Sequence, residues 1–164
     1  MNKKGFTVVE LLTTFVLITI VVSLLVMIST SLSKMYTTSS TKTELIYKQS
    51  VISKKMNEAF LLKQIVRIDR CNDKCITLTY SDYSTTRIEI DDTLIHIGKD
   101  TYDIVKHSNI GDVRIELVYS PITHGYKYDT ILNIRIPISY KGLNENYGIN
   151  LVYQFNRSKV QVSI

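Results

Sequence analysis

One acidic residue stands out in the sequence because it lies near the start of a long apolar run. Glu10 follows the segment Lys-Lys-Gly-Phe at residues 3–6, and after it no charge occurs before Lys34. An ionisable side chain in an apolar segment is costly, so it usually has a partner and a function. Glu10 is therefore the first candidate for a functional residue.

This arrangement resembles the N-terminus of type IV pilins and pseudopilins, which are class III prepilins. In that family a short basic leader is removed after Gly, the new N-terminal residue is usually a methylated Phe, and the fifth residue after the cut is Glu. The matching positions here are Gly5, Phe6 and Glu10. The resemblance covers about the first 30 residues. It implies a leader at residues 1–5, cleavage by prepilin peptidase between Gly5 and Phe6, N-methylation of Phe6, and a role for Glu10 in filament assembly.

Two other interpretations of this segment are a secretory signal peptide and a plain membrane anchor. A secretory signal peptide has a shorter apolar core and a small-residue cleavage site, whereas the uncharged run here covers residues 11–33. About 20 of these residues would cross a hydrocarbon core of about 30 Å. A plain membrane anchor fits this length but needs neither Gly5 nor Glu10. Lys3 and Lys4 predict a cytoplasmic N-terminus, which places the C-terminal part outside.

The apolar run is predicted to continue into one long helix, because Gly and Pro are absent between Gly5 and Gly98. We expect a helix over residues 6–68, about 90 Å long. Its membrane-spanning part is residues 6–33, where hydroxyls are expected to bond to carbonyls one turn back. Its exposed amphipathic part is residues 34–68, where apolar residues recur at steps of three, four and seven. The hydroxyl residues are Thr13, Thr14, Thr19 and Ser23, and the apolar face consists of Leu45, Ile52, Met56, Ala59, Leu62 and Val66.

Residues 69–164 are predicted to form an extracytoplasmic, β-rich, pilin-like domain. Apolar and polar residues alternate there, as in antiparallel sheets with one buried face. Pro137 cannot donate to a strand ladder, so its strand is expected at an edge or at a bulge. One helix followed by strands predicts an α+β fold, with the C-terminal half of the helix packed against a mostly antiparallel sheet. The predicted strands are residues 87–90, 94–97, 113–117, 132–140, 149–155 and 160–164.

Two cysteines, Cys71 and Cys75, enclose three residues at the expected junction of helix and sheet. An adjacent pair in an extracytoplasmic domain can oxidise. A small structural disulfide is favoured, and free thiols are the alternative. A metal site would need further ligands at matching spacing, and His96, His107 and His124 form no such motif.

The sequence contains no pattern typical of catalysis. It has no Gly-rich phosphate loop, no nucleophile elbow and no paired carboxylates on a helix face, and Asp91-Asp92 fits a turn better than an acid–base pair. We expect no enzyme, no cofactor and no metal. The net charge of +5 includes the two leader lysines, so DNA binding has no support from composition. Eleven tyrosines and no tryptophan suggest amphipathic strand surfaces. Because Tyr is enriched in interfaces, we expect some of these tyrosines to contact neighbouring subunits.

The resemblance implies a structural subunit, and a minor one, of a type IV filament used in adhesion and motility, DNA uptake in competence, or type II-like secretion. The implied partners are other pilin or pseudopilin subunits contacted through N-terminal helices, prepilin peptidase, the inner-membrane assembly platform, and the lipid bilayer before assembly. The implied location is the cytoplasmic membrane in a single pass, and then a surface or periplasmic filament. The alternatives are a single-pass, membrane-anchored extracellular binding protein that forms no filament, and a membrane-anchored enzyme.

Overall fold

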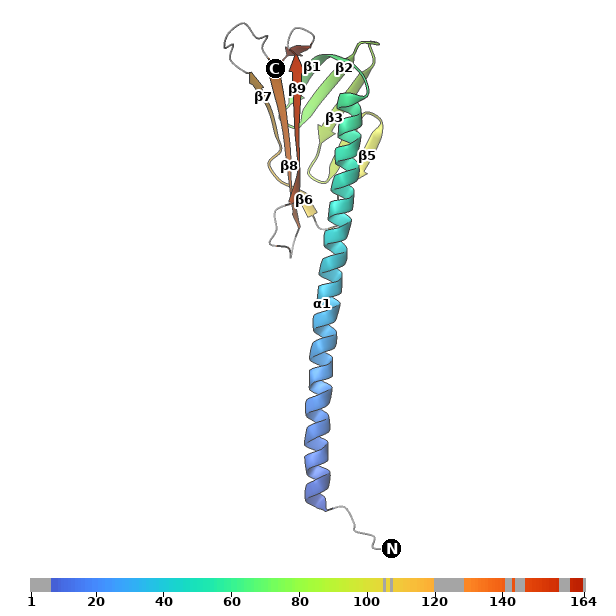
Figure 1. Cartoon of the computed structure of the whole chain (residues 1–164), viewed down its shortest axis with the longest axis vertical. Coiled ribbons are helices and arrows are strands. Elements are labelled where there is room, and N and C mark those ends of the chain that lie inside the picture. Colours follow the sequence, from blue (N-terminus) through green and yellow to red (C-terminus); the bar gives the residue numbers. More distant parts are fainter. Residues whose placement is uncertain are drawn as a thin grey trace. The chain divides into compact units, whose positions relative to one another are not determined.

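A computed structural model of the chain describes residues 7–104, 106, 108–119, 129–140, 143, 147–156 and 160–163. These residues form one helix followed by ten strands, which confirms the predicted α+β architecture (Figure 1). The chain divides into two compact units, residues 1–42 and residues 43–164.

The single helix, α1, covers Val8–Leu61. In the first unit, every side chain from residue 7 to residue 40 is exposed. The helix contains a stretch that is long and apolar enough to cross a membrane, which is typical of a membrane anchor or a signal sequence. No Gly or Pro lies within α1, so no residue that breaks or loosens a helix interrupts its hydrogen-bond ladder.

In the second unit, α1 packs its apolar face against the sheets. Leu45, Ile52 and Met56 are at most 1% exposed, and Ala59 packs against the same core. The predicted apolar face is therefore confirmed as far as Ala59. Phe60, the residue after Ala59, is 3% exposed and belongs to the same core in the last turn of α1.

The helix ends at Leu61, so the predicted end at residue 68 is wrong. Leu62 is 75% exposed, and Val66 belongs to the first strand. The segment from Ile65 to Ile68 contains three β-branched residues, which favour a strand over a helix. Apolar spacing alone could not distinguish the two structures over so short a segment.

The first sheet has six strands in the order β10-β1-β2-β3-β4-β5. The pair β1 and β10 is parallel, and all other pairs in this sheet are antiparallel. The sequence had predicted β3, β4 and β10 but not β1, β2 or β5. The strands are β1 (Ile65–Asn72), β2 (Cys75–Tyr80), β3 (Thr85–Ile90), β4 (Leu94–Ile97), β5 (Asp100–Asp103) and β10 (Gln161–Ser163).

The second sheet is antiparallel and has four strands: β6 (Ser108–Ile110), β7 (Arg114–Tyr119), β8 (Asp129–Tyr140) and β9 (Tyr147–Asn156). The long strand β8 pairs with β9 along one edge, and with β6 and β7 along the other. Pro137 therefore lies in a central strand, so the expected edge position is wrong. It is tolerated because it lies between the stretches of β8 that pair with β6 and β7, where its carbonyl accepts the Gly111 N–H at 2.9 Å.

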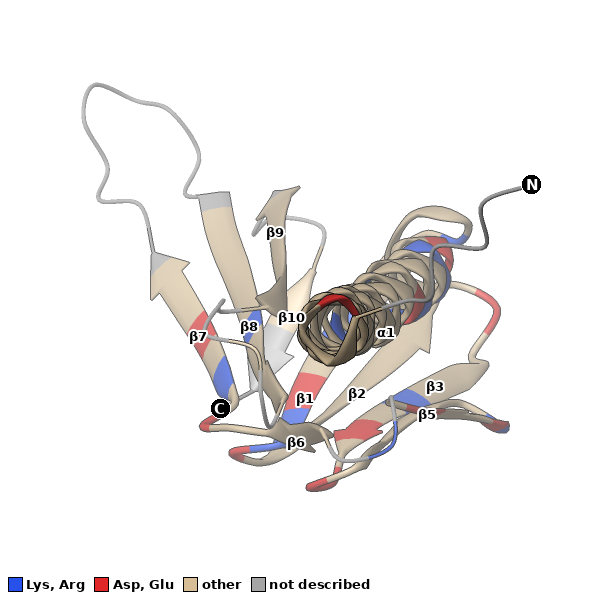
Figure 2. Cartoon of the chain, turned by 90° about the horizontal axis from the view of Figure 1, so that it is seen from below, with Lys and Arg blue, Asp and Glu red and all other residues tan. Residues whose placement is uncertain are grey.

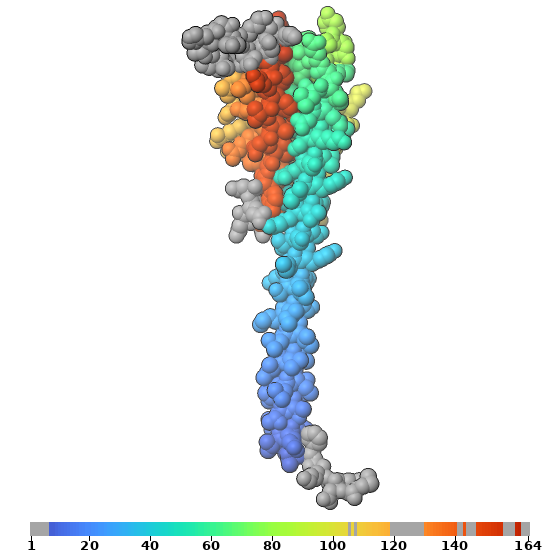
Figure 3. Space-filling model, viewed as in Figure 1, coloured from blue at the N-terminus to red at the C-terminus, as the bar shows by residue number. Residues whose placement is uncertain are grey.

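The core of the second unit lies between residues 43–61 of α1 and the two sheets. The Phe60 ring stacks on Tyr153 of β9 with centroids 4.0 Å apart, and Figure 3 shows β9 beside this part of the helix. The Tyr153 hydroxyl donates to Asn57 Oδ1 at 2.6 Å, and the Tyr80 hydroxyl donates to the Ala59 carbonyl at 2.8 Å. The largest fully buried side chains are Leu45, Ile52, Met56, Ile68, Ile76, Leu78, Ile88, Ile90, Ile95, Leu132, Ile134 and Ile136.

Candidate functional site

The start of α1 is closed by reciprocal hydrogen bonds between Thr7 and Glu10. The Thr7 backbone N–H and the Thr7 hydroxyl both donate to Glu10 Oε2 at 2.9 Å. In return, the Glu10 backbone N–H donates to Thr7 Oγ1 at 3.3 Å. This is a capping box, in which Thr7 is the N-cap and Glu10 is the third helical residue. It satisfies two backbone donors that would otherwise lack a partner at the helix start.

Glu10 therefore has a structural role at the helix start, and this role also favours an acidic side chain. A carboxylate in the first turn is stabilised by the positive end of the helix dipole, and capping matters most where no water can satisfy the backbone. Sequence analysis identified Glu10 but missed its partner Thr7. The signal was present, because Thr followed three residues later by Glu is the capping-box pattern.

Glu10 has no ion-pair partner among the described residues of the helix, where the next charged side chain is Lys34. Residues 7–33 contain no basic side chain, so any ion-pair partner of this carboxylate lies outside that segment. Gly5 and Phe6, the predicted cleavage and methylation positions, lie outside the described residues.

Five hydroxyl side chains of the apolar stretch donate hydrogen bonds to carbonyls within the helix. As predicted, the hydroxyls of Thr13, Thr14, Thr19 and Ser23 donate to carbonyls three or four residues earlier. Thr30 does the same toward Met27. Because each of these five hydroxyls already has an acceptor, none of them exposes an unpaired donor to lipid or to another apolar helix. Glu10 is the one charged side chain between residues 7 and 33, so it remains the candidate functional residue of this segment.

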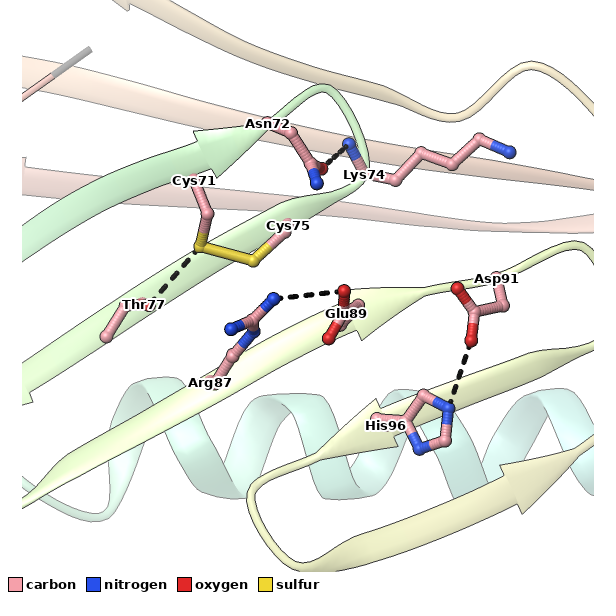
Figure 4. Close-up of polar contacts among 9 residues, drawn as sticks. All are labelled: Cys71, Asn72, Lys74, Cys75, Thr77, Arg87, Glu89, Asp91 and His96. Carbon is pink, nitrogen blue, oxygen red and sulfur yellow. Dashed lines mark hydrogen bonds and ion pairs between the residues drawn. A yellow bond between two sulfur atoms is a disulfide. The ribbon is translucent and has the colours of Figure 1, made fainter.

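The second candidate site is the cysteine pair. Cys71 and Cys75 are joined by a disulfide with a Cα–Cα distance of 5.2 Å (Figure 4). The bond crosses the hairpin between β1 and β2, so the expected position at the junction of helix and sheet is wrong. Cys71 is exposed and close to Thr77, with 3.4 Å between Sγ and Oγ1, whereas Cys75 is fully buried. The disulfide is placed to hold the hairpin, which is a structural role.

The outer face of the first sheet carries charged residues in close pairs. Arg87 contacts Glu89 at 3.0 Å, and His96 Nε2 lies 3.2 Å from Asp91 Oδ2 (Figure 4). The other His96 ring nitrogen is 2.9 Å from the Thr101 hydroxyl. Exposed pairs of this kind contribute little to stability, and they form no group of chemically activated residues.

The turn between β2 and β3 is tied to the end of α1 by a further pair, in which Lys63 Nζ lies 2.7 Å from Asp82 Oδ2. This hydrogen bond, with others from Ser84, holds the pKa of the Asp82 carboxyl well below its usual range. Within the described part of the chain, no three His, Cys, Asp or Glu residues are placed to hold a metal ion. His107 and His124 lie outside that part.

Comparisons with protein-family models, with curated proteins and with solved structures found no match. The architecture is compatible with a pilin-like fold but is not specific to it, since it consists of a long apolar N-terminal helix followed by antiparallel strands. Any assignment of function therefore depends on the residues at the start of the chain.

Proposed function

We propose that this chain is a prepilin-like subunit of a type IV filament, in a pilus, a competence system or a type II-like secretion system, and that it is a minor subunit. The observation that carries the proposal is the order of residues at the N-terminus. Two lysines, Gly5, Phe6 and Glu10 precede an uninterrupted helix that is long and apolar enough to cross a membrane. The helix begins at Val8, directly after the segment in which cleavage is proposed.

The proposed life history begins in the cytoplasmic membrane. Lys3 and Lys4 hold the N-terminus inside, and residues 43–164 fold outside. Prepilin peptidase then cuts between Gly5 and Phe6 and methylates Phe6. The assembly platform lifts the processed subunit into a bundle of neighbouring N-terminal helices.

Glu10 is proposed to fix the position of an incoming subunit. A carboxylate in hydrocarbon needs a partner, and cleavage creates a cation, the α-amine of Phe6. In the filament, the amine of a neighbouring subunit pairs with Glu10. The hydrogen bonds from Thr7 hold the carboxylate at the helix start in the meantime, so the same side chain caps its own helix and receives the neighbour.

Three variants separate charge pairing from helix capping. Glu10→Val removes both functions, Glu10→Gln removes the charge but keeps an acceptor suitable for a capping box, and Thr7→Val removes the hydroxyl but keeps the charge. Leader removal and recovery in sheared filaments are measured for each. We expect all three to be inserted and cleaved, and both Glu10 variants to stay in the membrane fraction, whereas Thr7→Val enters filaments.

Recovery of Glu10→Gln in filaments at the wild-type level would show that Glu10 acts only as a helix cap. Recovery of Glu10→Val at that level would remove Glu10 from assembly altogether.

A further inference from the structure

In the part of the chain that the structure describes, the strand β7 has one open edge. Among the described residues it pairs only with β8, over Arg114–Tyr119. An open edge presents a row of unpaired backbone N–H and C=O groups, which is a template for another strand. Proteins often cover such edges, and this one is six residues long, enough to bind an extended segment.

A hollow of about 420 Å³ runs along this edge, within the size range of ligand pockets. Residues 113–117 line one side of it, and Arg70 and Asp73 of the β1–β2 hairpin line the other. Buried Ile115 and exposed Arg114 both face it. Because these residues belong to opposite faces of β7, the hollow follows the edge of the strand rather than one face of the sheet.

Two arginines, one on β7 and one on its neighbour β8, have no acidic partner among the described residues. Arg114 of β7 lies directly opposite Arg135 of β8, and both are exposed. Figure 2 shows blue segments, which mark Lys or Arg, on both strands. Like charges opposite each other on neighbouring strands are destabilising. Neither arginine forms an ion pair with a described residue, whereas in the first sheet the described arginines do: Arg67 with Asp69, Arg70 with Asp73, and Arg87 with Glu89.

We propose that the edge of β7 binds an extended, carboxylate-bearing segment of another protein, which adds to the sheet as a further strand. The backbone of the segment would pair with the open edge, and side chains at alternate positions would give specificity. An acidic side chain would neutralise the opposed pair Arg114 and Arg135, and an apolar one would pack toward Ile115. The segment therefore alternates acidic and apolar residues.

Charge favours this occupant over two others. A nucleic acid would need a longer basic surface, but Glu116 lies two residues from Arg114 on the exposed face of β7. A second copy of the chain would have to offer its own acidic edge strand, β5. There both acids already have partners: Asp103 Oδ2 lies 2.8 Å from Lys48 Nζ, and Asp100 Oδ2 accepts from the Tyr102 hydroxyl at 3.4 Å.

The test uses the full-length chain in non-ionic detergent and measures fluorescence anisotropy of labelled peptides. The probes are the blocked peptide Val-Asp-Val-Thr-Val-Asp-Val-Thr and the same peptide with Lys in place of Asp. We expect at least tenfold tighter binding of the acidic peptide. Arg114→Glu should weaken that binding at least tenfold and favour the basic peptide instead. Lys99→Glu, an exposed residue elsewhere with the same change of net charge, should change it less than twofold.

Equal binding of the two peptides, or equal effects of the two charge variants, overturns the proposal. Self-association of the wild-type chain that Arg114→Glu abolishes would assign the edge to a second copy, and displacement of the peptide by an oligonucleotide of equal charge would assign it to nucleic acid. Circular dichroism of Arg114→Glu shows whether the fold is kept, and Arg114→Lys, which retains the charge, should bind the acidic peptide within a few-fold of wild type. The assay involves no filament, so its failure leaves the proposed function standing.

Discussion

Replacing Ile52 by Ala tests how the C-terminal part of α1 is held. Ile52 is 1% exposed and faces the core, whereas Ile46 in the same helix is 57% exposed. The substitution removes about three methylene equivalents, each worth about 0.8 kcal/mol when buried, and the cavity left behind adds to this loss. The better helix propensity of Ala returns about 0.4 kcal/mol. We expect the free energy of unfolding to fall by about 3 kcal/mol.

Ile46→Ala is the matched control, because it makes the same chemical change and gains the same helix propensity. At an exposed position, the free energy of unfolding should change by less than about 0.5 kcal/mol. Urea unfolding of the full-length chain in non-ionic detergent is followed by near-ultraviolet circular dichroism of the tyrosines, since the chain has no tryptophan. If the two variants lost the same free energy of unfolding, the packing of Ile52 against the sheets would be refuted.

Two further predictions concern Tyr153 and the cysteines. Burial raises the pKa of Tyr153 to about 12, above the value of about 10 in the unfolded chain. Its contribution to stability is therefore complete below pH 10 and is lost as pH rises from 10 to 12, by about 3 kcal/mol for a shift of two pKa units. Tyr153→Phe should flatten the unfolding free energy over that pH range, and an unchanged slope would contradict the assignment. For the disulfide, alkylation of the unreduced protein should label neither Cys71 nor Cys75. Quantitative labelling of both would show free thiols.

Much of the fold could be predicted because the apolar patterns of the helix and of several strands are long and regular. The face formed by Leu45, Ile52 and Met56 and the alternation along β8 were both recognisable from spacing. The end of the helix was not, because Leu62 and Val66 continue the helical spacing although the chain has already turned into β1. The β-branched residues of this segment favour a strand only weakly, and the pairing of β1 with β2 and β10, which decides the structure, is non-local and does not appear in local sequence.

In the candidate sites, too, some residues were predictable from local sequence and others were not. Glu10 was found because a charge in an apolar run is conspicuous, and Thr7 was overlooked because a threonine near a helix start is common. Pro137 indicated an edge strand or a bulge, and it lies in the central strand β8, opposite the break between β6 and β7. The open edge of β7 and the opposed pair Arg114 and Arg135 depend on strand register across the second sheet, which sequence spacing alone does not determine.

The most direct test of the proposed function is the mass of the mature N-terminus. The protein is expressed with prepilin peptidase, purified from membranes and analysed by mass spectrometry of its N-terminal peptide. We expect a chain that begins at Phe6 and carries one added methyl group on its α-amine. In Gly5→Val the leader should remain, because the side chain blocks close approach to the backbone at the cut. A wild-type chain that keeps residues 1–5 in the presence of the peptidase would contradict the prepilin interpretation and leave a plain membrane anchor.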